Sequence, residues 1–178
     1  MDYLYSLGFI ILGILLFSVA LATISLAPWV PTRKKDLKRI FELLDLKEGG
    51  IIYDLGCGTG GVVLYGARKY KLRARGIELG LPFYIICVIR KIFSGNKRAK
   101  FIWGDFFKTD FSDANAVYLF GLPASLKNKL KEKLKKELKP GTKIISYVFS
   151  IEGWDAVRID KGGKKQVNIY LYEIVFSH

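Results

Sequence analysis

An uncharged amino-terminal segment is the strongest constraint on how this chain folds. Residues 3–32 contain no Asp, Glu, Lys or Arg, and residues 7–27 are almost wholly apolar. As an α-helix, the apolar part would be about 32 Å long at about 1.5 Å per residue, which matches a hydrocarbon layer about 30 Å thick. Pro28 would end that helix. The sequence therefore predicts a transmembrane helix within residues 1–30 and a separate folded domain over residues 31–178.

The charges around this segment predict its orientation. Asp2 is the one charged side chain before it, whereas five basic residues follow closely: Arg33, Lys34, Lys35, Lys38 and Arg39. Because cytoplasmic flanks carry the excess of Lys and Arg, we expect a single-pass membrane protein with its domain in the cytoplasm and its amino-terminus outside. A cleaved signal peptide is the alternative, which is disfavoured because the start carries no Lys or Arg.

Composition excludes several classes of protein. The 178 residues are 51% hydrophobic and 25% charged, which suits one sizeable core and excludes a disordered chain. The chain has two cysteines, Cys57 and Cys87, and one histidine, His178. These counts exclude a disulfide scaffold, a zinc cluster, a histidine-based metal site and a Ser-His-Asp triad. We therefore expect no metal, and neither a triad hydrolase nor a metalloenzyme.

Strand and helix patterns alternate along the rest of the chain. Short apolar runs predict strands at 51–54, 74–79, 100–103, 116–120 and 143–150, and longer periodic or apolar runs predict helices at 34–47, 62–70, 82–93 and 124–138. Two further strand patterns, 156–160 and 167–176, predict a terminal antiparallel hairpin. Alternating strands and helices form a mostly parallel sheet covered on both faces, so the predicted fold class is α/β.

A glycine-rich turn follows the first predicted strand, in the sequence Asp54-Leu55-Gly56-Cys57-Gly58-Thr59-Gly60-Gly61. Glycines let the backbone turn tightly and approach a ligand, and the start of the next helix offers free N–H groups. The spacing of Gly56, Gly58 and Gly61 also fits the G-x-G-x-x-G pattern of dinucleotide sites, in which the preceding strand residues are normally apolar. Asp54 would repel a pyrophosphate but suits a ligand with an ammonium group, such as S-adenosylmethionine.

Acidic residues follow two more predicted strands. Glu78 ends the second strand, where a carboxylate can accept both hydroxyl groups of a ribose. The alternative for Glu78 is a surface ion pair with Arg75. Asp105 follows the third strand, where it would accept from an adenine amino group while Phe106 covers the ring. Because ligands bind at the carboxyl ends of the strands in such sheets, we expect these acids to line one site.

These residues resemble those of class I S-adenosylmethionine-dependent methyltransferases, which have a Rossmann-like fold. The likeness lies in the turn from Asp54 to Gly60, in the Gly-Ile-Glu-Leu end of the second strand and in the Gly-Asp pair after the third. Other segments are similar to small protein-lysine methyltransferases, a family that includes the mitochondrial ATP synthase c-subunit and adenine nucleotide translocase lysine methyltransferases and small archaeal enzymes. These segments are Trp29-Val30-Pro31-Thr32, residues 117–123, residues 137–142 and Gly153-Trp154. The membrane-anchored members also begin with a hydrophobic segment.

The resemblance implies S-adenosylmethionine as cofactor and a lysine side chain as methyl acceptor. The expected cofactor-binding residues are Asp54, Gly56, Cys57, Gly58, Gly60, Glu78, Asp105 and Phe106. Methyl transfer is an in-line displacement without metal or covalent intermediate, but the lysine amine, with a reference pKa of about 10.4, must lose its proton. The family motif implies that backbone carbonyl groups near Leu119 and Phe120 orient the amine. Tyr118 is a candidate base, although strand alternation would equally bury it in the sheet.

The net charge of +13 calls for a partner or a solvated face. Residues 68–100 include ten Lys or Arg and one acid, Glu78. The basic residues could form a solvent-exposed face or bind nucleic acid. No recognised nucleic-acid-binding motif accompanies them. Binding to a membrane surface accounts for both the basic residues and the apolar run that they flank. Residues 79–89 form this run, which is too short to span a bilayer but can lie at its interface. We expect a monomer that acts on a membrane protein and binds no nucleic acid.

Two other functions stay open from the sequence. One is a methyltransferase that acts on a lipid or quinone at the membrane. The other is a non-catalytic S-adenosylmethionine-binding protein, because Thr59, Gly60 and Gly61 stand where the resembled family usually has an acid followed by Gly-Arg.

Overall fold

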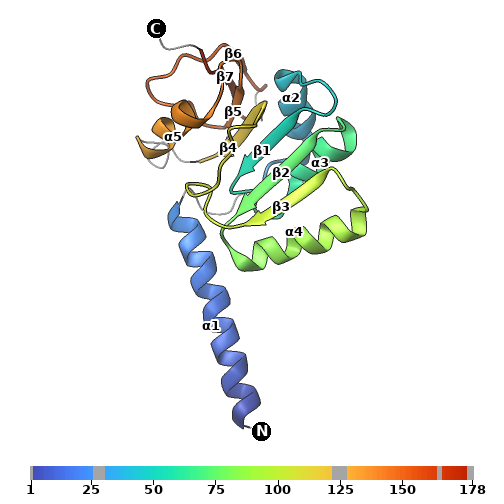
Figure 1. The fold of residues 1–178 in the computed structure, drawn as a ribbon, viewed down its shortest axis with the longest axis vertical. Helices are drawn as coiled ribbons and strands as arrows, with labels where there is room; N and C mark the ends of the chain where they lie inside the picture. The colour runs from blue at the N-terminus through green and yellow to red at the C-terminus, as the bar shows by residue number, and fades with distance from the viewer. Residues whose placement is uncertain (1, 26–30, 122–127, 164–165, 176–178) are drawn as a thin grey trace.

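The computed structural model describes residues 2–25, 31–121, 128–163 and 166–175, which form one seven-stranded sheet, five helices and their connections (Figure 1). The strand order is β3-β2-β1-β4-β5-β7-β6. Strands β1 to β5 are parallel to one another, and β7 is antiparallel to both β5 and β6. The strands are β1 (Ile51–Leu55), β2 (Arg73–Glu78), β3 (Ala99–Trp103), β4 (Ala116–Phe120), β5 (Lys143–Tyr147), β6 (Arg158–Asp160) and β7 (Ile169–Glu173). The predicted α/β class and its terminal antiparallel hairpin are confirmed.

Helices cover both faces of this sheet, as predicted. Their bounds are α1 (Asp2–Ser25), α2 (Lys34–Leu44), α3 (Gly61–Lys69), α4 (Leu81–Ser94) and α5 (Lys129–Glu137). Side chains of α2, α3 and α4 share one hydrophobic cluster with one face of the sheet. On the opposite face, α5 packs in a second cluster together with residues 106–114. The sheet is therefore buried on both sides, which leaves its strand ends as the place for a ligand site.

The amino-terminal helix α1 projects away from this domain (Figure 1). Its described side chains are exposed, among them Tyr3 at 91%, Phe9 at 74% and Phe17 at 66%. Within the described ranges, none of the helices combines the length and the apolar character needed to cross a membrane. The transmembrane helix expected within residues 1–30 is therefore not found in that part of the chain.

Most predicted elements differ from the observed ones by a few residues at an end, including the helix predicted over 34–47, which ends at Leu44. The fifth strand was expected over 143–150 but ends at Tyr147, because Val148 has a positive φ of 76° that breaks the extended backbone. The helix expected over 124–138 is α5, Lys129–Glu137, and residues 124–127 of that prediction lie outside the described residues.

Close packing in the middle of β2 yields a testable stability prediction. A Cβ atom on Gly76 would lie 2.6 Å from the Cys57 Sγ atom and 2.9 Å from the Val63 Cγ2 atom. We expect Gly76→Ala to lower the free energy of unfolding by about 1–3 kcal/mol, because overpacking in a filled core forces side chains and backbone to shift. Denaturant unfolding measures the change. Gly61→Ala is the matched control, because nothing lies within 4 Å of its added Cβ, and equal stability of the two variants would contradict the prediction.

Candidate functional site

The glycine-rich turn lies between the carboxyl end of β1 and the start of α3. Gly56, Gly58 and Gly60 have positive φ angles of 78°, 53° and 75°. At Gly60 a side chain is also excluded by space, because an added Cβ would lie 2.6 Å from the Phe101 ring. The turn closes on itself through the Gly60 N–H, which donates to the Cys57 carbonyl oxygen over 2.8 Å. The backbone is thus held in a tight arc at the edge of the sheet, as the sequence predicted.

Helix α4 holds this turn from the side. The Cys87 thiol donates to the Gly58 carbonyl oxygen over 3.0 Å, and the Arg90 guanidinium donates to the Thr59 carbonyl oxygen. Cys57 lies in the core with its sulfur 4.0 Å from that of Cys87, and its N–H donates to the Ile77 carbonyl. In the structure Cys57 therefore shapes the turn, and its expected role in cofactor binding stays a prediction.

Glu78 joins the turn to the start of α4. Its Oε2 accepts from the Gly58 N–H and its Oε1 from the Gly80 N–H, each over 2.7 Å. Burial raises the pKa of Glu78, and the N–H groups of Gly80 and Gly58 partly oppose that shift. The alternative of a surface pair with Arg75 is wrong, because Arg75 pairs with Asp113 at 2.8 Å. A buried carboxylate at this position keeps lone pairs for ligand hydroxyl groups, since each oxygen can accept more than one hydrogen bond.

Asp54 is the most deeply buried acid at this edge. It is 3% exposed and pairs in register with Gly76 on β2 and Tyr118 on β4. Burial, with a smaller contribution from the Glu78 charge, raises the pKa of Asp54 well above that of an ordinary aspartate. Two buried carboxyl groups that disfavour each other's ionisation form a site that a cationic ligand would stabilise.

The third acid lies farther along the same edge. The Gly104 N–H donates to the Glu78 carbonyl oxygen over 2.9 Å, which keeps the segment after β3 beside the end of β2. The Asp105 carboxylate accepts from the Phe107 N–H over 2.8 Å through Oδ1. The Phe106 ring is 5% exposed and lies 4.4 Å from the Phe107 ring in the core. The structure thus brings the three acids to one edge, while the adenine contacts of Asp105 and Phe106 stay predictions.

Four aromatic side chains lie close together at the carboxyl ends of β4 and β5, the strands that follow β1 in the order of the sheet. The ring centroids of Phe120 lie 5.7 Å from Tyr147 and 6.2 Å from Phe149, and those of Tyr118 and Tyr147 are 6.3 Å apart. We call Tyr118, Phe120, Tyr147 and Phe149 the aromatic group. The turn that carries Phe149 is fixed by the Ser146 hydroxyl, which donates to the Phe149 carbonyl oxygen over 2.6 Å. Val148, between Tyr147 and Phe149, has a positive φ of 76°. Such a strained backbone costs about 1–3 kcal/mol and is typical of functional sites.

Tyr118 occupies the buried position that strand alternation allowed. It is 2% exposed, and its hydroxyl is 2.7 Å from the Thr32 hydroxyl. Burial, reinforced by the Asp54 charge, raises the pKa of Tyr118 well above its usual value, so the phenol stays protonated at neutral pH. This environment disfavours Tyr118 as a general base. The expected roles of Leu119, which is fully buried in β4, and of Phe120 concern their backbone carbonyl groups and stay predictions.

Two residues that contact the aromatic group were missed from the sequence. Thr32 bonds Tyr118, and the buried Asp36 accepts from the Tyr147 hydroxyl over 2.7 Å. Burial and this bond raise the pKa of Tyr147 to about 12. A signal for Asp36 exists in the sequence, because Asp36, Ile40 and Leu44 repeat at helical spacing on the buried side of α2. Through these bonds the start of α2 covers the ends of β4 and β5.

The carboxylates and the glycine turn at this edge fit S-adenosylmethionine. Asp54 would hold the ammonium group, Glu78 the ribose hydroxyl groups, and the glycine arc would let the ligand approach the backbone. The cofactor would supply a methyl group on a positively charged sulfur. The aromatic group lies at the ends of the neighbouring strands β4 and β5, where its rings would orient an acceptor and keep water away. This arrangement can transfer a methyl group by orientation and exclusion of water alone.

Comparisons with known proteins agree with this reading. Residues 54–158 match the family model of the ANTKMT methyltransferase domain. The chain is 35% identical over 153 residues to a protein-lysine N-methyltransferase of Saccharolobus islandicus (strain REY15A), covering 83% of this chain and 93% of that protein. A similar solved structure is an RNA methyltransferase from Salinibacter ruber in complex with S-adenosyl-L-homocysteine, with a TM-score of 0.78, 31% identity and coverage of 84% and 96%.

A second solved structure shows the same fold at greater distance. It is a SAM-dependent methyltransferase from Geobacter sulfurreducens in complex with S-adenosyl-L-homocysteine, with a TM-score of 0.59, 24% identity and coverage of 74% of this chain and 53% of that one. The family match and the Salinibacter ruber structure confirm the cofactor that the three acids led us to expect. Family match, relative and site chemistry lead to one conclusion: the chain belongs to the ANTKMT methyltransferase domain family and is an S-adenosylmethionine-dependent methyltransferase.

Proposed function

We propose that the methyl acceptor is the ε-amino group of a lysine in a protein. The relative from Saccharolobus islandicus carries this proposal, because it is described as a protein-lysine N-methyltransferase and shares 35% identity with this chain across 93% of its own length. The resemblance of residues 29–32, 117–123, 137–142 and 153–154 to small protein-lysine methyltransferases implies the same acceptor.

The aromatic group supports an amine as the acceptor. Faces of aromatic rings attract a cationic side chain, and the centroid of the Phe120 ring lies 5.7 Å from that of Tyr147 and 6.2 Å from that of Phe149. A lysine that reaches this group leaves water, which disfavours its charged form and lowers its pKa. Desolvation among the rings, rather than a general base, is our explanation for how the amine loses its proton.

RNA is the second candidate acceptor, and two observations favour it. The Salinibacter ruber structure is described as an RNA methyltransferase, at 31% identity. The net charge of +13 also suits a phosphate backbone. The aromatic group does not separate the two candidates, since rings can also stack on bases. Lipids and quinones, which the sequence analysis left open, are a third class of possible methyl acceptor.

Labelled cofactor distinguishes these acceptors. The purified full chain is incubated with S-adenosylmethionine labelled in its methyl group and, separately, with a protein fraction, total RNA and a lipid extract. We expect label in protein, released on hydrolysis as methylated lysine and located by mass spectrometry. The Asp54→Asn variant is the control, since it removes the carboxylate that would hold the cofactor ammonium.

The contrary outcomes are equally specific. Label in RNA or lipid but not in protein would replace the lysine proposal with the corresponding acceptor. Cofactor binding without label in any fraction would support the non-catalytic alternative suggested by Thr59 and Gly61.

We propose further that α1 attaches the methyltransferase domain to a membrane. Support comes from the exposed apolar side chains along the described part of this helix, such as Leu4 at 74% and Leu16 at 62%. A domain held at a membrane meets membrane-bound targets at a higher effective concentration. The cytoplasmic side of the domain, the outside amino-terminus, the division at residues 30 and 31 and the monomeric state stay predictions.

A further inference from the structure

The outward face of α4 is apolar and exposed. Its large apolar side chains are Ile85 at 43%, Ile86 at 40%, Ile89 at 46%, Ile92 at 71% and Phe93 at 87%. Because these positions repeat at intervals of three and four residues, they lie along one side of the helix, which we call the α4 stripe. The opposite side of the helix contacts β2 and β3, where Cys87 is buried. A continuous exposed stripe of this kind marks an interaction surface.

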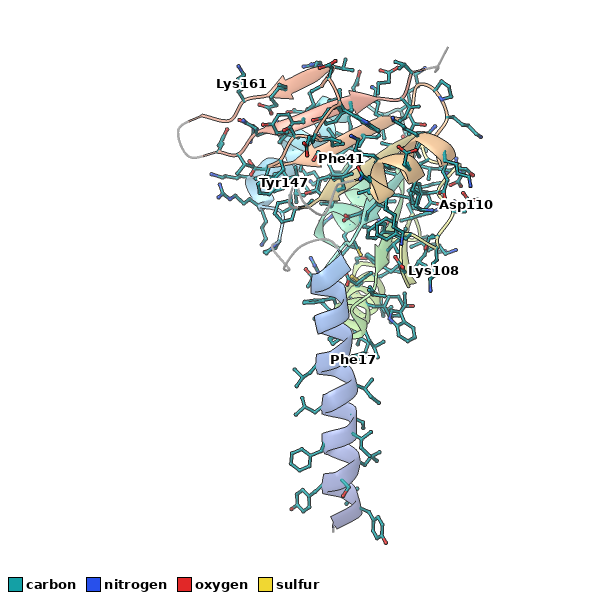
Figure 2. The ribbon with its side chains drawn as sticks, turned by 90° about the vertical axis from the view of Figure 1, so that its left-hand side faces the viewer. Phe17, Phe41, Lys108, Asp110, Tyr147 and Lys161 are labelled. Carbon is teal, nitrogen blue, oxygen red and sulfur yellow. The ribbon has the colours of Figure 1, made fainter. Side chains whose placement is uncertain are left out.

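The α4 stripe lies at the end of the domain from which α1 projects. Helix α1 packs against α4, and both views place α4 beside the upper part of α1, away from β6 and β7 (Figures 1 and 2). In Figure 2, Phe17 on α1 and Lys161 in the β6–β7 hairpin lie toward opposite ends of the molecule. A flat apolar layer that receives α1 would therefore also meet α4.

Basic residues accompany the α4 stripe. No Asp or Glu occurs in the sequence between Glu78 and Asp105, whereas this segment contains Arg90, Lys91, Lys97, Arg98 and Lys100. Beside the helix is a hollow of about 520 Å³. Its lining combines Tyr84, Val88, Ile92 and Phe101 with the lysines Lys91 and Lys97. An apolar hollow with two ammonium groups suits an acyl chain with an anionic headgroup.

We propose that the α4 stripe inserts into the interfacial layer of an anionic membrane. The inference rests on the proposed attachment by α1 and gives that attachment a second contact, which fixes how the domain sits. Lys91 and Lys97 then lie at the level of the lipid phosphates, while Ile89, Ile92 and Phe93 enter the acyl region. Charge complementarity and continuity with α1 favour lipid over a protein partner or a second copy of the chain.

This placement has a consequence for the acceptor. Glu78 ends β2 and α4 begins at Leu81, so the first turn of α4 lies beside the proposed cofactor site, whereas Ile92 and Phe93 lie toward the other end of the helix. A docked α4 would hold its first turn, and with it the Glu78 end of β2, near the membrane surface. Acceptor lysines close to the headgroups are then favoured over those on distant domains.

Site-directed fluorescence on the full chain tests the insertion. Phe93→Cys and Lys161→Cys are each labelled with an environment-sensitive thiol probe, and the native Cys57 and Cys87 are buried and do not compete. Vesicles contain phosphatidylcholine with or without phosphatidylserine, and a nitroxide on the upper acyl chain serves as quencher. Equal S-adenosylmethionine binding by both variants shows that they are folded.

We expect a blue shift and nitroxide quenching for the probe at position 93, stronger with phosphatidylserine, and neither for the probe at position 161. Co-flotation with vesicles while the probe at position 93 stays in water would overturn the α4 docking and leave the α1 attachment standing. Absence of flotation would overturn both. A dimer in sedimentation velocity that Phe93→Glu dissociates would assign the α4 stripe to a second copy instead. None of these results bears on the lysine acceptor, which the labelled-cofactor assay tests.

Discussion

Asp54→Asn is expected to weaken S-adenosylmethionine binding by about tenfold to a hundredfold. The reason is the loss of a charge-assisted hydrogen bond, worth about 1.5–3 kcal/mol, to the ammonium group of the cofactor. Isothermal titration calorimetry on the full chain measures the change. Asp113→Asn is the matched control, because Asp113 pairs with the exposed side of Arg75 before β4 begins and lies away from the carboxyl edge.

The raised pKa of Asp54 predicts a pH dependence with a definite sign. The free protein holds the Asp54 proton to higher pH than an ordinary aspartate would, and a bound ammonium group favours the carboxylate. Binding therefore releases a proton, and the affinity falls as pH is lowered through the free-state pKa of Asp54. Titrations should stay below the cofactor's α-amino pKa, about 7.7–8.0, so that the ligand remains cationic. In Asp54→Asn this dependence should be lost.

The same substitution should raise the stability of the free protein. A carboxyl group whose pKa is higher folded than unfolded binds more protons when folded, so its contribution to stability grows as pH falls and is unfavourable at neutral pH. Asp54→Asn removes that unfavourable ionisation, and thermal unfolding without ligand should show a higher midpoint. A lower midpoint together with weaker binding would mean that Asp54 supports the fold rather than the ligand.

Arg39→Met is expected to lower the free energy of unfolding by about 3–5 kcal/mol. Arg39 donates to Asp36 Oδ1 over 2.8 Å and to Asp160 Oδ2 over 2.9 Å, and also to the Val167 carbonyl oxygen. Because Asp36 is fully buried, removal of Arg39 leaves a buried carboxylate without this cationic partner, although the Tyr147 hydroxyl still donates to its Oδ2 over 2.7 Å. Breaking one partner of a buried pair is costly for this reason.

Lys38→Met is the matched control for this change. Lys38 adjoins Arg39 on α2, but its pair with Glu42 is 3.5 Å long and both side chains are more than half exposed. Such surface pairs contribute about 0–1 kcal/mol, so this variant should unfold near the wild-type midpoint. Denaturant unfolding compares the two, and similar losses would show that Arg39 acts through general helix charge. Since Asp36 also holds Tyr147, Arg39→Met should in addition disturb the aromatic group.

The sequence by itself determined the class of fold and the cofactor. Strand and helix patterns alternate at periods that the backbone imposes, so the sheet and its helices could be predicted within a few residues. The site acids could be predicted for the same reason: Asp54, Glu78 and Asp105 each follow a strand, and parallel strands end at one edge. These signals are local in the chain or follow from topology.

Only the tertiary structure decided what the acids and the aromatic residues touch. Glu78 bonds Gly58 and Gly80 rather than pairing with Arg75, and Tyr118 is buried against Thr32 rather than poised as a base. The contacts of Asp36 with Tyr147 and of Arg39 with Asp160 join residues more than a hundred positions apart. Such contacts depend on how α2 packs across the ends of β4 and β5. This packing is determined by the shapes and burial of side chains throughout the core, so it cannot be predicted from a local pattern of residues.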